Sequence, residues 1–130
     1  MTTFVRVRTG DGEYAVAVDH AREVRSGIGM MPLPFPRAGV VGLLPGDGDP
    51  LTVIATLGAG RDHVMVLEPP AGRLFGLWVE EVLGLVSVAA DELGPPPSGQ
   101  IGELVTGVFN GPDGLVLVVD VAVLASTVTS

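Results

Sequence analysis

The sequence of 130 residues contains no cysteine and no lysine. Without cysteine there can be no disulfide bond, no thiol nucleophile and no thiolate ligand for a metal. The seven basic residues are all arginines, spread singly along the chain. The chain also has 15 aspartates and glutamates, so its net charge is -8. Nucleic acids and anionic membrane surfaces are recognised by concentrated positive charge, so both are disfavoured as partners.

Long apolar runs are also missing. The longest, residues 115–125, is interrupted by Asp120 and is too short to span a bilayer. The first ten residues, MTTFVRVRTG, lack the charged region followed by an apolar region that is typical of a signal peptide. We therefore expect a cytoplasmic protein. Because 47% of the residues are hydrophobic, the chain can still build a substantial core.

What the chain does contain is a series of short valine-rich segments separated by glycine, proline and aspartate. This spacing predicts about ten strands in a single domain, which is typical of an all-β barrel or sandwich. One or two helical turns are predicted within residues 19–25, with Asp19 as N-cap, and a short helix is predicted from Asp120. Gly76 and Gly84 interrupt strand patterns and predict bulges or tight bends of a small barrel. The predicted strands cover residues 4–9, 14–19, 40–44, 51–55, 63–68, 73–80, 82–89, 104–110 and 115–121, and the proline-rich residues 27–39 are expected to form an ordered loop.

The segment PGDGDP, residues 45–50, could be a calcium loop, a carboxylate pair or a hairpin turn. An EF-hand counted from Asp47 needs an oxygen ligand at its fifth position and a glutamate at its twelfth, and these positions hold Leu51 and Gly58. The calcium pattern therefore fails. Glycine, proline and aspartate between two apolar strands favour the hairpin turn.

No other residues form a recognisable catalytic or metal-binding set. Glu80 and Glu81 point to opposite faces of a strand, and His20 and His63 stand alone. Neither a G-x-S-x-G motif nor a glycine-rich phosphate loop occurs. The sequence therefore predicts a binding protein rather than an enzyme, with no cofactor and no metal, and leaves Trp78 open as a core residue or an interface residue.

Four segments taken in order resemble the CheW family of chemotaxis coupling proteins. The strongest likeness is GRLFGLWVEEVLGLVSVAADELGPPP, which resembles a pair of family strands followed by an acidic turn and a proline cluster. The other segments resemble the opening hairpin, the proline-containing approach to the next hairpin, and the terminal T-G-V, D-G and D-V pattern. The four segments are residues 13–24, 31–44, 72–97 and 104–124.

The resemblance implies an all-β fold of two small five-stranded SH3-like barrels packed on a shared apolar seam, with one or two short helices. We expect one domain over residues 1–130, with sub-barrels near residues 1–60 and 61–130 and strand exchange at the termini. It further implies a non-enzymatic adaptor that joins the regulatory domain of a CheA-like histidine kinase to the cytoplasmic tip of a chemoreceptor.

One turn departs from the family pattern. Where the family usually has G-x-x-N-x-R-G, the asparagine position is Pro45 and the arginine position is Asp47. This change reverses a charge and removes a forked hydrogen-bond donor. The resemblance places candidate partner contacts at Glu23, Val24, Asp47, Gly48, Val64 and Val66.

Two other classes of function stay open on the sequence. One is a small β-barrel that binds a ligand or serves as an accessory subunit of an enzyme, in which case an enclosed pocket with converging polar groups is expected. The other is a self-associating structural protein.

Overall fold

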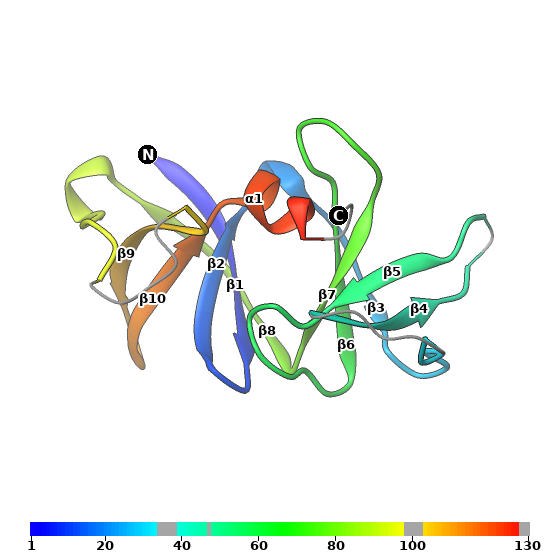
Figure 1. Cartoon of the computed structure of the whole chain (residues 1–130). Coiled ribbons are helices and arrows are strands. Elements are labelled where there is room, and N and C mark those ends of the chain that lie inside the picture. The colour runs from blue at the N-terminus through cyan, green and yellow to red at the C-terminus, as the bar shows by residue number, and fades with distance from the viewer. Residues whose placement is uncertain (34–38, 47, 98–102, 128–130) are drawn as a thin grey trace.

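The computed structural model describes residues 1–33, 39–46, 48–97 and 103–127. These residues form two five-stranded sheets that lie side by side, with one short α-helix where the sheets meet (Figure 1). The first sheet has the strand order β8-β1-β2-β10-β9 and the second has the order β3-β6-β7-β5-β4. The all-β architecture predicted from the sequence is confirmed.

The first sheet joins the first two strands of the chain to the last three. Its strands are β1 (Thr2–Thr9), β2 (Gly12–Ala17), β8 (Glu81–Val88), β9 (Val105–Gly111) and β10 (Gly114–Val119). The second sheet is built from one continuous stretch, with β3 (Ala21–Ser26), β4 (Val40–Leu44), β5 (Leu51–Ile54), β6 (His63–Leu67) and β7 (Phe75–Val79). The expected division at residues 1–60 and 61–130 is therefore wrong, because residues 2–17 pair with residues 81–119 rather than with the second sheet.

The two sheets repeat the same pairing pattern. In each, the neighbours pair antiparallel, antiparallel, parallel and antiparallel along the strand order, and the parallel pairs are β2 with β10 and β5 with β7. Strands β8 and β3 occupy equivalent edges. In each sheet the chain that follows this edge strand crosses to the opposite edge, where Met31 pairs with Leu43 and Gly94 pairs with Val108. These bridges close each sheet towards a barrel.

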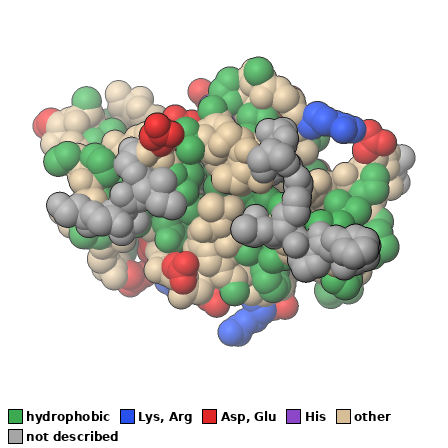
Figure 2. All heavy atoms as spheres, viewed as in Figure 1, with side chains coloured by type: hydrophobic (Ala, Val, Ile, Leu, Met, Phe, Trp, Pro, Cys, Tyr) green, Lys and Arg blue, Asp and Glu red, His purple; other side chains and the backbone are tan. Residues whose placement is uncertain are grey.

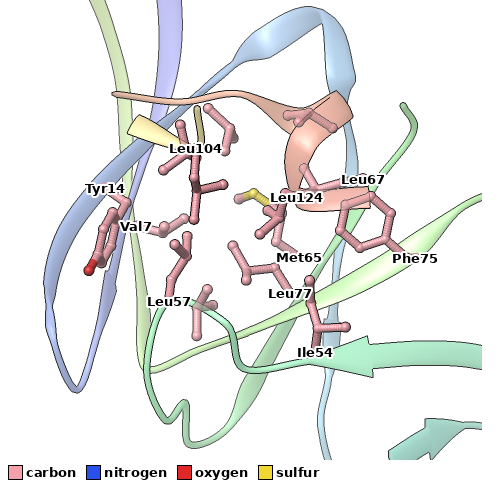
Figure 3. Close-up of a cluster of buried hydrophobic side chains, with 14 of the residues drawn as sticks. Val7, Tyr14, Ile54, Leu57, Met65, Leu67, Phe75, Leu77, Leu104 and Leu124 are labelled. Atoms are coloured by element: carbon pink, nitrogen blue, oxygen red, sulfur yellow. The ribbon is translucent and has the colours of Figure 1, made fainter. Parts of the chain in front are cut away.

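Three apolar clusters hold the structure together. The largest lies between the sheets and joins Val7 and Tyr14 from the first to Met65 and Leu77 from the second, as Figure 3 shows. Each of the other two clusters is formed by the side chains of one sheet. In the first sheet the buried residues are Phe4, Ala15, Val88, Phe109, Val116 and Val118, and in the second they are Leu44, Leu51, Val53, Val64 and Val66.

The short helices follow the sequence only in part. One or two helical turns were expected within residues 19–25. The structure has a single 3-10 turn, η1 (Val18–His20), and the chain then continues as β3. Asp19 lies inside this turn and is not its N-cap, a position that Ala17 occupies. A second 3-10 helix, η2 (Ala90–Glu92), follows β8. Helix α1 (Val121–Ser126) confirms the predicted helix at Asp120, whose Oδ1 accepts hydrogen bonds from the backbone N–H groups of Ala122 and Val123.

The two strand glycines have different roles. Gly84 has φ +113° and lies where the pairing of β1 with β8 shifts by one residue, so the predicted bulge is confirmed there. Gly76 instead pairs regularly with Val66 and Val53. An added Cβ at Gly76 would lie 2.5 Å from Val64 Cγ1, so a glycine is needed there for close packing.

Candidate functional site

A groove of about 950 Å³ opens beside the second sheet. The space-filling view is hollowed at its upper right, where a basic and an acidic side chain lie across a gap (Figure 2). The lining combines apolar side chains such as Leu51 and Phe75 with charged residues at its rim. The lining residues come from β3, β4, β5, β6, the segment 69–75, the β4–β5 turn and helix α1.

An ion pair crosses the rim of this groove. Arg73, from the segment between β6 and β7, places Nη2 2.6 Å from Oδ2 of Asp49 in the β4–β5 turn. Both side chains are at least 80% exposed, so the pair contributes little to stability. The pair nevertheless brings a cation and an anion to the mouth of an apolar groove.

A second arginine ties the same turn to the sheet. Arg25 of β3 donates from Nη2 to the carbonyl oxygen of Pro45 at 2.8 Å. The turn itself joins β4 to β5, and Leu44 pairs with Leu51 at its base, so the predicted hairpin is confirmed. Arg25 and Arg73 therefore reach the turn from two different segments. Sequence reasoning missed both residues, because neither lies near the turn along the chain.

Two of the six predicted contact residues lie at the surface of this groove. Glu23 of β3 and Gly48 of the turn are exposed and line it. Val24 is 47% exposed and does not line the groove, since neighbouring side chains on a strand point to opposite faces. Asp47 lies outside the described residues.

The other two predicted residues are buried. Val64 and Val66 are 0% and 3% exposed, and both belong to the apolar cluster inside the second sheet. The Val64 side chain therefore has no exposed surface to offer a partner. Val66 touches the floor of the groove, where it offers only a small apolar surface. Strand β6 is buried on both faces, because Met65 and Leu67 join the cluster between the sheets.

Helix α1 also lines the groove, a position that no sequence pattern indicated. Ala122, Ala125 and Ser126 face it, although β10, which leads into this helix, belongs to the first sheet. The helix is held by Leu124, which is fully buried in the cluster between the sheets. The groove therefore depends on both sheets.

Trp78, left open as a core or interface residue, is half-buried and packs against the cluster inside the second sheet. Its Nε1 donates to the carbonyl oxygen of Arg61 at 3.1 Å, which satisfies the polar atom of the ring. Trp78 is not among the residues that line the groove. Packing of the sheet accounts for this residue.

The described residues contain no metal-binding cluster. Within them, no group of three or more histidine, cysteine, aspartate or glutamate side chains could hold a metal ion. Burial, with a smaller contribution from Asp11, raises the pKa of Tyr14, but this residue lies in the cluster between the sheets and away from the groove. His20 donates a hydrogen bond from Nδ1 to the carbonyl oxygen of Glu68 at 3.0 Å.

Comparisons with known proteins agree with this geometry. The family model described as the CheW-like domain matches residues 3–129. The chain belongs to the CheW-like domain family. Membership makes it a coupling adaptor of the chemotaxis type, built as two SH3-like barrels.

A solved structure supports the fold of this CheW-like chain. The scaffolding protein TtCheW from Thermoanaerobacter tengcongensis matches with a TM-score of 0.76 and 17% sequence identity, over 92% of this chain and 88% of that one. No curated protein matches the sequence. In the part of the chain that the structure describes, no helix combines the length and apolar character needed to cross a bilayer.

Proposed function

We propose that this CheW-like adaptor joins a CheA-like histidine kinase to the cytoplasmic tip of a chemoreceptor by docking alone. It catalyses no reaction, needs no cofactor and acts in the cytoplasm. The observation that carries the proposal is the groove, whose apolar floor and charged rim fit a protein segment better than a reacting small molecule. The groove is open, whereas the alternative of a ligand-binding barrel calls for an enclosed pocket.

The groove suits an amphipathic helix. Leu74, which is 47% exposed, and the small side chains of α1 offer an apolar surface, and Glu23 and Arg73 line the groove beside it. A helix that lays its apolar face in such a groove can pair its flanking charges with the rim. The coiled tip of a receptor provides helices of this kind.

An adaptor must keep a second surface free while the first is occupied. Strand β3 offers one, because Glu23 and Arg25 line the groove while Val24 does not. Exposed apolar side chains continue beyond β3, with Ile28 at 86% and Met31 at 47% exposure. We assign the groove to one partner and the surface of Val24, Ile28 and Met31 to the other.

The test is to measure binding of each partner separately by titration calorimetry. Glu23→Arg should weaken binding of the groove partner at least tenfold, with little effect on the second partner. Val24→Lys should weaken binding of the second partner, with little effect on the groove partner. Asp91→Arg makes the same charge change as Glu23→Arg on η2, where the side chain is exposed, and serves as the matched control. Folded wild-type protein that binds neither partner at micromolar concentration would refute the proposal, and equal loss of both partners in both variants would refute the two-surface assignment.

A further inference from the structure

Strand β8 is an edge strand whose outer side pairs with no other strand in the part of the chain that the structure describes. It pairs with β1 on one side only. After Glu81 its sequence is VLGLVSV, so residues 82–88 carry no charge. Leu85 is 66% exposed. An uncharged, exposed edge offers unpaired backbone N–H and C=O groups to another chain.

The equivalent edge of the other sheet is protected. Strand β3 has the sequence AREVRS, with Arg22, Glu23 and Arg25 among its six residues. Charged side chains on an edge oppose pairing with another strand. The two barrels share one pairing pattern, yet only the edge at β3 carries this protection.

We propose that β8 pairs antiparallel with β8 of a second copy of this chain, about a two-fold axis at Leu85. A second copy fits this edge because the strand is close to self-complementary in that register. Leu85 then lies opposite its own counterpart, and Val82 lies opposite Val88. Glu81 lies opposite Ala89, so no like charges face each other across the axis.

Charge also favours this occupant. Each copy carries a net charge of -8, so two copies repel each other over most of their surface. Residues 82–88 form a strip without charge, and electrostatic repulsion between two copies is lowest where these strips meet. A strongly charged partner strand would find no opposite charges there.

The dimer should be weak. The bulge at Gly84 twists the edge and shortens the stretch that can pair regularly. A contact made by one short strand falls well below the area of a standard interface, so dimer formation is expected over about 10 to 1000 μM. No residue of β8 lines the groove, so a dimer would carry two open grooves and could engage two partner segments together.

Disulfide trapping tests the register directly, because the native chain has no cysteine. In an antiparallel pair, residues directly opposite have Cα atoms about 4.5 to 5.5 Å apart, a span that a disulfide bridges without strain. Leu85→Cys should therefore form covalent dimers under mild oxidation, seen on a non-reducing gel. Leu115→Cys is the control, since Leu115 is 58% exposed but lies on β10, which is paired on both sides.

Sedimentation velocity tests the association without a cross-link. Wild-type protein should shift from monomer to dimer across the stated range, Leu85→Lys should stay monomeric, and Leu115→Lys should dimerise like wild type. Circular dichroism confirms that each variant is folded. Monomeric wild type at 1000 μM, or cross-linking of Leu115→Cys as fast as Leu85→Cys, would overturn the proposal. Both assays omit the kinase and receptor, so their outcome is separate from that of the adaptor proposal.

Discussion

Replacement of Leu124 by alanine tests whether packing of α1 supports the groove. The helix has six residues, far too few to be stable alone, so its position depends on tertiary contacts. Leu124 is fully buried between the sheets, and truncation of such a leucine costs about 3 kcal/mol from lost transfer energy and the remaining cavity. For a chain of this size we expect the melting temperature to fall by about 10 °C.

The same variant should also weaken the groove. Ala122 and Ala125 of α1 form part of its wall, so a loosened helix should reduce binding of the groove partner more than binding of the second partner. Differential scanning calorimetry and binding titration well below the melting temperature measure the two effects. Val123→Ala is the control, because Val123 is only half-buried and its truncation should cost about 1 kcal/mol. A Leu124→Ala variant as stable as this control would show that α1 is not anchored as described.

A glycine substitution with its control, and the titration of Tyr14, test the packing of the core. Gly76→Ala should lower the melting temperature by about 3 to 5 °C, because the methyl group would meet Val64 Cγ1 at 2.5 Å and this overpacking outweighs the smaller entropic gain from removing a strand glycine. Gly94→Ala, where the nearest atom lies at 3.8 Å, should be neutral or stabilising, and an equal loss there would contradict the packing argument. Tyr14, the single tyrosine of the chain, should ionise in the folded protein above its ordinary pKa of about 10, because burial and then Asp11 raise that pKa. Since the folded state holds the phenolic proton more tightly, the stabilisation from protonated Tyr14 is present below the pKa of the unfolded state and is lost as the pH rises through the pKa of the folded state. Titration of native and urea-unfolded protein, followed by ultraviolet absorbance, measures the difference between the two pKa values. Equal titration midpoints would contradict the prediction.

The sequence predicted most strands because local signals define them. Turns rich in glycine, proline and aspartate separate the valine-rich runs, and the structure places strands at nearly all of the predicted ranges. Residues 21–25 were misassigned because Ala-Arg-Glu-Val-Arg has good helix propensity. Pairing of β3 with β6 outweighs that preference, which is worth only a few tenths of a kcal/mol per residue.

The burial of Val64 and Val66, two of the predicted contact residues, could have been predicted from the sequence. HVMVL has no polar residue after His63, and a strand without polar alternation is typical of one that is buried on both faces. That pattern, had it been applied, predicts Val64 and Val66 as core residues. The partition of strands between the sheets was not accessible in the same way, because the parallel pairs β2–β10 and β5–β7 join segments that no local signal connects.

The chain topology links the candidate site to completion of the whole fold. The second sheet uses residues 21–79 in one stretch, whereas the first sheet must join residues 2–17 to residues 81–119. Helix α1 follows the last strand, packs Leu124 between the sheets and then forms one wall of a groove that belongs mainly to the second sheet. The groove is therefore complete only when β10, which precedes α1, has paired with β2 near the start of the chain. A chain that lacks β9, β10 and α1 would lose one sheet and also part of the proposed docking surface on the other, so partner binding through the groove requires the intact two-barrel fold.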